Sequence, residues 1–122
     1  LLSMLRDGGV LSLTFYNLHG IILKNLLRVN YSKVLNKEFA GWPGSLTPDF
    51  PRTPEEVVDW VKHENADIIV HSGIRVFHDY VLDLKDKEKD LETVLALELE
   101  YSRKMPYRDL GRYQHLVIKK AS

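Results

Sequence analysis

The first seventeen residues constrain the fold of this chain more than any other segment. Leucines within residues 1–5 are spaced as on one face of a helix, and Gly8-Gly9 provides a left-handed stop after them. Residues 10–15 form a short apolar run, which is typical of a strand covered on both faces of a sheet. A helix that leads through a tight turn into such a strand is half of an α/β unit. We therefore expect the chain to begin in the middle of an α/β fold.

The rest of the chain alternates between helical and strand patterns. The clearest local signal is a capping box, in which Thr53 as N-cap, Pro54 and Glu56 begin a helix. Gly73 lies inside an apolar run and indicates either a bulge or a close approach of another segment. The order of elements favours one α/β sheet, into which the final strand could insert in either direction. We expect an amphipathic helix over 21–28, a loop over 36–51, a helix from 53 to about 65, a strand over 66–77, a long helix from 83 to 105 and a strand over 113–120.

Charge is balanced over the whole chain but unevenly distributed along it. Lys plus Arg and Asp plus Glu each number 17, so the net charge gives no reason to expect a polyanionic partner. Residues 1–37 nevertheless hold five basic residues against one acidic residue, and residues 102–122 hold six against one. The excess acid lies in 49–67 and 83–101. If the two basic ends converge, a neutral protein carries a basic face; the alternative is ordinary solvated charge.

Composition excludes several classes of protein. A chain of 122 residues, 44% of them hydrophobic, can bury one core of single-domain size. It has no cysteine, and no apolar run approaches the roughly 20 residues that cross a bilayer. The first residues lack a secretory signal pattern, so we expect a cytoplasmic protein with no membrane partner. We expect no metal site either, because no recognised ligand spacing links His63, His71, His78 and Asp79.

Four segments carry a resemblance to a known family. They are residues 8–20 (GGVLSLTFYNLHG), 46–52 (LTPDFPR), 73–80 (GIRVFHDY) and 106–115 (PYRDLGRYQH). Together they resemble the C-terminal half of class I S-adenosylmethionine-dependent methyltransferases, and within that class the bacterial tRNA 5-carboxymethoxyuridine methyltransferase family. The resemblance runs through essentially the whole chain in the same order.

The resemblance implies a fold, a reaction and a partner. The fold would be the C-terminal portion of a Rossmann-like domain, with a mostly parallel sheet and an antiparallel last strand. Residues 1–17 would supply a helix end and strand, 18–65 a helical substrate-side region, and 66–122 the closing strands and helix. The reaction would methylate the carboxylate of 5-carboxymethoxyuridine at the tRNA wobble position, with the anticodon stem-loop as partner. The resemblance implies nothing about oligomeric state.

The cofactor fingerprint of this class is not found in the sequence. A glycine-rich turn after the first strand and an acidic residue beyond it hold the cofactor in the N-terminal half of such enzymes. Gly8-Gly9 precedes a strand instead of following one, so it is not that turn. We therefore expect the N-terminal cofactor-binding half to be absent here. S-adenosylmethionine would act in the complete enzyme and would not bind to this fragment alone.

Methyl transfer to a carboxylate makes few demands on catalytic residues. The carboxylate is already an anionic nucleophile at neutral pH, so no general base is needed and no catalytic residue is identified. Catalysis can rest on positioning and on removal of water. The site needs a cationic grip on the carboxylate, which the planar fork of arginine supplies best.

Location then selects the candidates. Ligands of open α/β sheets bind at the carboxyl ends of strands, where Tyr16 and Asn17 lie, although both could simply form a turn. Arg75 lies within an apolar run and needs an anionic partner, either the substrate or Asp79. His78 could stack on a base or merely pack. The substrate-binding candidates are Tyr16, Asn17, Arg75, His78, Tyr80, Tyr107, Arg112 and Tyr113.

Basic residues near aromatic ones suggest contacts with RNA. Residues 107–113 interleave tyrosine with arginine, a combination suited to stacking on unpaired bases and to phosphate contact. Two other functions stay open: a methyltransferase for a small-molecule acid, and a non-catalytic RNA-binding or assembly module. The RNA-binding candidates are His19, Lys24, Arg28, Arg52 and Arg108, and Lys33 and Lys37 extend the same basic surface.

Overall fold

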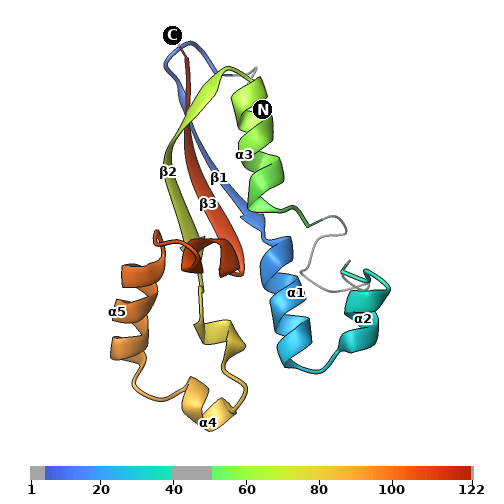
Figure 1. Cartoon of the computed structure of the whole chain (residues 1–122). Coiled ribbons are helices and arrows are strands. Elements are labelled where there is room, and N and C mark those ends of the chain that lie inside the picture. Colours follow the sequence, from blue (N-terminus) through green and yellow to red (C-terminus); the bar gives the residue numbers. More distant parts are fainter. Residues whose placement is uncertain (1–4, 40–50, 122) are drawn as a thin grey trace.

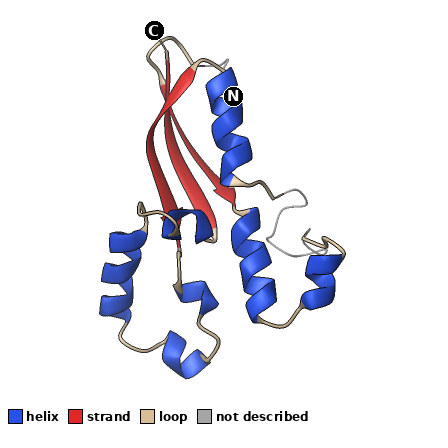
Figure 2. Ribbon diagram, viewed as in Figure 1, coloured by secondary structure: helices blue, strands red, loops and turns tan. Residues whose placement is uncertain are grey.

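The computed structural model describes residues 5–39 and 51–121, which fold around a small three-stranded sheet (Figures 1 and 2). The expected opening helix and the loop over 36–51 lie largely outside these residues. Gly8 has the expected left-handed backbone, with φ of 78°. The elements are β1 (Val10–Tyr16), α1 (Leu18–Leu27), α2 (Tyr31–Leu35), α3 (Pro54–His63), β2 (Ala66–Ile74), η2 (His78–Tyr80), α4 (Leu84–Lys87), α5 (Leu91–Tyr101), η3 (Tyr107–Leu110) and β3 (Tyr113–Lys120).

The last strand lies in the middle of the sheet. The strand order is β1-β3-β2, and β3 is antiparallel to both neighbours, so the expected antiparallel last strand is confirmed. The mostly parallel sheet is not seen among the described strands, since each strand pairing there is antiparallel. Because β1 and β2 run in the same direction, their carboxyl ends meet at one edge, together with the start of β3.

The core forms where α3 covers one face of the sheet (Figure 1). Val61 of α3 packs with Ala66, Leu116 and Ile118, all of which are buried. The threonine cap of α3 is as expected: Thr53 Oγ1 accepts a hydrogen bond from the backbone N–H of Glu56 at 3.2 Å. The expectation that both faces of the first strand are covered is wrong for the described residues. Exposed residues alternate with half-buried ones along β1, because α3 lies on one side only.

Two helical regions extend beyond the carboxyl ends of β1 and β2. One, α1 and α2, follows β1, and the other lies between β2 and β3 (Figure 1). The expected single helix from 83 to 105 is instead two helices, α4 and α5, because Asp90 adopts a left-handed backbone with φ of 51°. Its expected apolar stripe lies exposed at Leu91, Leu95 and Leu99.

The second strand ends earlier than the sequence indicates, and this changes the setting of Arg75. β2 ends at Ile74, and Arg75 follows it with a left-handed φ of 59°, so the placement of Arg75 inside a strand is wrong. The apolar run continues past the strand because Val76 is buried by other contacts. The bulge lies between Ile68 and Val70. At Gly73 the close approach of another segment is confirmed, since a Cβ added there would overlap the carbonyl oxygen of Arg108.

We expect Gly73→Ala to lower the free energy of unfolding by about 2 kcal/mol or more, because overpacking at a fixed backbone is relieved only by moving η3 away from β2. Urea denaturation measures this loss. Within the described residues, the neighbouring variant Ser72→Ala removes only a side-chain hydrogen bond from the exposed Arg103, and it should change stability by less than about 0.5 kcal/mol. Equal stability of the two variants would contradict the close approach.

Candidate functional site

Asn17 holds together the edge at which β1 and β2 end. Its side chain is fully buried, and its Nδ2 donates to the carbonyl oxygens of Asp109 at 2.7 Å and Gly111 at 2.8 Å. Its Oδ1 accepts from the backbone N–H of His19 at 3.1 Å, which caps α1. The amide is therefore engaged by the chain itself. Direct contact of Asn17 with a substrate stays a prediction.

Helix α1 packs closely against this edge through a glycine. A Cβ at Gly20 would lie 3.0 Å from the carbonyl oxygen of Gly111 and 3.2 Å from the Tyr80 hydroxyl. That hydroxyl donates to the carbonyl oxygen of Leu110. Burial, together with the negative charges of Asp79 and Glu98, raises the pKa of Tyr80 to about 12. Tyr80 therefore stays protonated at physiological pH and links η2 to the segment before β3.

A buried carboxylate faces two arginines at the same edge. The Asp79 side chain is 8% exposed; its Oδ1 lies 3.5 Å from Nη1 of Arg75 and its Oδ2 lies 3.4 Å from Nη1 of Arg112. The structural pairing of Arg75 with Asp79, one of the two alternatives from the sequence, is thus present. The Arg75 side chain is 52% exposed and that of Arg112 is 33% exposed. Each guanidinium has further N–H groups with which it could bind a second anion.

Lys24 adds a third positive charge. It lies one helical turn after Gly20, so it is on the face of α1 that packs toward Arg112. Burial lowers the pKa of the Lys24 ammonium, and the charges of Arg112 and Arg28 lower it further. We call Lys24, Arg75 and Arg112 around Asp79 the cationic cluster. Lys24 is one of the RNA-binding candidates, and its spacing from Asn17 and Gly20 along the helix is the sequence signal for its position in this cluster.

Arg112→Met should raise the pKa of Lys24 toward its ordinary value, because the variant removes a neighbouring positive charge. The pKa can be followed by NMR titration of the Lys24 side chain. Arg103→Met, at an exposed arginine hydrogen-bonded to Ser72, serves as the control and should leave the Lys24 pKa where it is. If Arg112→Met also left it unchanged, Lys24 and Arg112 would not share one site.

Of the three tyrosine candidates other than Tyr80, two lie beside the cluster and one does not. The rings of Tyr16 and Tyr113 meet edge to face with centroids 4.8 Å apart, and the Arg112 guanidinium lies 5.3 Å from the Tyr113 centroid. Tyr107 instead contacts Tyr101 of α5, at 4.9 Å between centroids. It lines a hollow of about 250 Å³ with Val76, Phe77 and Leu97.

His78 is bound by its own chain. One ring nitrogen lies 2.5 Å from the carbonyl oxygen of Lys87, and its backbone N–H donates to Glu98. These contacts favour the packing interpretation, and base stacking by His78 stays a prediction.

The RNA-binding candidates divide into paired and exposed residues. His19 lies 2.8 Å from Glu55. Burial opposes ionisation of the Glu55 carboxyl, but the hydrogen bond and charge of His19, together with hydrogen bonds from Thr53 and the backbone, outweigh burial and lower its pKa. Arg108 pairs with Asp109 at 3.0 Å. The exposed basic residues on α1, α2 and the segments that follow them are Arg28, Lys33 and Lys37.

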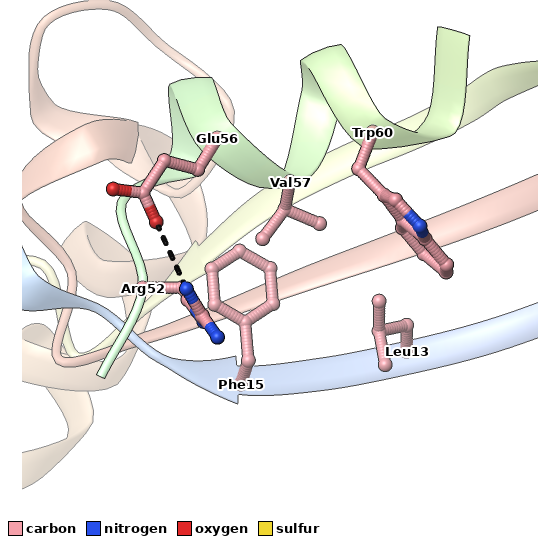
Figure 3. Close-up of a pocket in the computed structure, with 6 residues that line it drawn as sticks. All are labelled: Leu13, Phe15, Arg52, Glu56, Val57 and Trp60. Atoms are coloured by element: carbon pink, nitrogen blue, oxygen red, sulfur yellow. Dashed lines mark ion pairs between the residues drawn. The ribbon is translucent and has the colours of Figure 1, made fainter. Parts of the chain in front are cut away.

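A hollow that is more apolar than the cationic cluster lies between β1 and α3 (Figure 3). Its volume is about 470 Å³, and Leu13 and Phe15 of β1 face Val57 and Trp60 of α3 across it. At its rim Arg52 pairs with Glu56 at 3.9 Å. An apolar lining with one paired arginine suits an apolar group better than a carboxylate. We therefore place the candidate anion site at the cationic cluster.

No helix within 5–39 or 51–121 is long and apolar enough to span a membrane. The same residues contain no group of three or more His, Asp or Glu side chains arranged to hold a metal ion.

Comparison with known proteins tests the resemblance. No family model matches the chain. The tRNA 5-carboxymethoxyuridine methyltransferase of Escherichia coli K12 is 41% identical to it, over 97% of this chain and 45% of that protein. The resemblance is confirmed. The protein of the same name from Escherichia coli O157:H7 gives the same identity and coverage. This chain thus spans less than half the length of these methyltransferases, which is consistent with the expected match to one half of them.

Proposed function

We propose that this chain is the substrate-side part of a tRNA methyltransferase that esterifies the carboxylate of 5-carboxymethoxyuridine at the wobble position. The name of the relatives supports the substrate, and their 41% identity supports the reaction class. The observation that carries the proposal for this chain is the cationic cluster. Two arginines flank one buried carboxylate where the carboxyl ends of β1 and β2 meet, and the charge of Lys24 is near enough to interact with Arg112. The positive charge of these side chains exceeds the negative charge of Asp79, which leaves positive charge for a second anion.

The chain's own residues would bind and orient the substrate carboxylate. Asp79 fixes one nitrogen of each arginine, so the remaining N–H groups of Arg75 and Arg112 can hold one carboxylate oxygen and leave the other free to attack a methyl group. No proton has to move, because the nucleophile is already ionised. The aromatic pair of Tyr16 and Tyr113 would exclude water from this side and could stack on the wobble base.

S-adenosylmethionine would supply the methyl group. The residues described for this chain do not fit that cofactor: Asn17, which follows β1, uses its side chain internally, and the nearby acid Asp79 is held by two arginines. In this proposal residues 1–122 are the C-terminal part of one methyltransferase domain, and cofactor binding belongs to residues outside this chain.

The test is methyl transfer by the protein at full length. Labelled S-adenosylmethionine is supplied with tRNA that carries 5-carboxymethoxyuridine, and with the same tRNA carrying unmodified uridine as the control. We expect only the tRNA with 5-carboxymethoxyuridine to gain the labelled methyl group. Base should release this label, because the product is a methyl ester. Equal labelling of the free modified nucleoside would favour a small-molecule acid as substrate. Salt-dependent binding of tRNA without labelling would favour a non-catalytic module.

A further inference from the structure

A second carboxylate accepts hydrogen bonds from the backbone between Arg75 and Asp79. Glu98 projects from α5, and its Oε1 accepts from the N–H of Val76 at 2.6 Å. Its Oε2 accepts from the N–H of His78 at 3.0 Å and, less closely, from that of Phe77 at 3.4 Å. Three consecutive backbone donors thus converge on one side chain. Such concave groups of N–H donors bind anions, and here the anion belongs to the protein.

The position of this contact along the chain gives it a role. The three N–H groups lie between Arg75 and Asp79, the two ends of an ion pair in the cationic cluster. Arg75 has a left-handed backbone, which is strained for a non-glycine residue and persists only when other contacts hold it. Glu98 supplies such contacts from a different element.

We propose that Glu98 is a positioning residue, which fixes the segment from Arg75 to Asp79 so that the cationic cluster faces the substrate carboxylate. This inference rests on the proposed function. Glu98 would not touch the substrate; it would set the direction of the Arg75 and Arg112 forks through the backbone that carries Arg75 and Asp79. Loss of the contact should weaken recognition of the substrate's carboxylate more than binding of the cofactor.

The experiment compares Glu98→Gln with Glu100→Gln in the protein at full length. Glutamine has one accepting oxygen in place of two and presents an NH₂ group to backbone donors, so it cannot satisfy all three N–H groups. Glu100 lies on the same helix, is half exposed and contacts only Lys104 among the described side chains, at 3.5 Å. Glu98→Asp is a second variant, which keeps both accepting oxygens on a shorter side chain.

We expect two results from Glu98→Gln. Hydrogen exchange of the Val76, Phe77 and His78 amides should accelerate about tenfold or more. The KM for carboxylated tRNA should rise about tenfold, while the KM for S-adenosylmethionine changes less than twofold. Glu98→Asp should lie between Glu98→Gln and the unaltered protein in both measurements, and Glu100→Gln should match the unaltered protein.

Other outcomes would overturn the inference in distinguishable ways. Faster exchange with an unchanged KM for tRNA would make Glu98 purely structural, as would failure of both Glu98 variants to fold while Glu100→Gln folds. Unchanged exchange would show that the three amides do not depend on Glu98. An unaltered protein that does not methylate carboxylated tRNA would instead reject the proposed function, and this role with it, before any variant is compared.

Discussion

Replacing Asn17 with aspartate should lower the free energy of unfolding by at least about 3 kcal/mol. The side chains have nearly the same shape, but the variant turns a donor toward the carbonyl oxygens of Asp109 and Gly111 into a negatively charged acceptor. The site is fully buried, so water cannot compensate. Because β1, η3 and α1 all meet at Asn17, the loss should appear as cooperative unfolding in urea.

The loss of stability in Asn17→Asp should depend on pH in a definite direction. Burial and two facing carbonyl oxygens would raise the pKa of an aspartate at position 17 in the folded state. Its destabilising effect should therefore be largest near neutral pH and shrink toward about pH 5, as protonation restores a donor. Asn30→Asp is the control, since Asn30 is exposed and its side chain donates, among the described residues, only to Asn25 at 3.1 Å. A similar small loss in both variants would contradict the role of the Asn17 amide.

Arg112→Lys should lower kcat/KM for carboxylated tRNA about tenfold or more, equivalent to about 1.4 kcal/mol or above. Lysine keeps the charge but loses the fork that can hold Asp79 and a second carboxylate together, and it loses the planar contact with the Tyr113 ring. Arg75→Lys should act in the same direction. Single-turnover methyl transfer with saturating cofactor measures the effect.

The stability of the same variants separates substrate binding from structure. If Arg75 and Arg112 only neutralise Asp79, lysine should lower the melting temperature while the folded fraction turns over normally. The exposed Arg103→Lys provides the baseline for both measurements, because its side chain bonds only to Ser72 among the described side chains. Unchanged turnover in Arg75→Lys and Arg112→Lys would show that the cationic cluster does not bind the substrate.

The strands and the capped helix follow from local patterns. The strand patterns at 10–15 and 113–120 form β1 and β3, and the capping box at Thr53 begins α3, because each signal depends on neighbours in the sequence. The end of β2 and the break in the expected long helix were less predictable. β2 ends before Arg75 and α5 begins after Asp90, and both of these non-glycine residues adopt a left-handed backbone.

The candidate site was only partly visible in the sequence. Arg75 and Asp79 are four residues apart, so their pairing could be weighed as an alternative. Arg112 joins them because its backbone N–H donates to the carbonyl oxygen of Arg75, beside the pairing of β2 with β3. Lys24 joins them through the packing of α1 against the segment before β3. Glu98 was not singled out at all, since its partners are backbone N–H groups and leave no trace in side-chain chemistry.

The place of β3 between β1 and β2 affects how the protein can be made on the ribosome. Val10 pairs with Lys119, so roughly one hundred further residues must be synthesised after β1 before β3 is available to pair with it. Until then β1 and β2 lack the strand that lies between them, and two unpaired edges are open to chaperones or to aggregation. A premature stop codon before Tyr113 would therefore abolish sheet and anion site together, and leave no partly active truncation product.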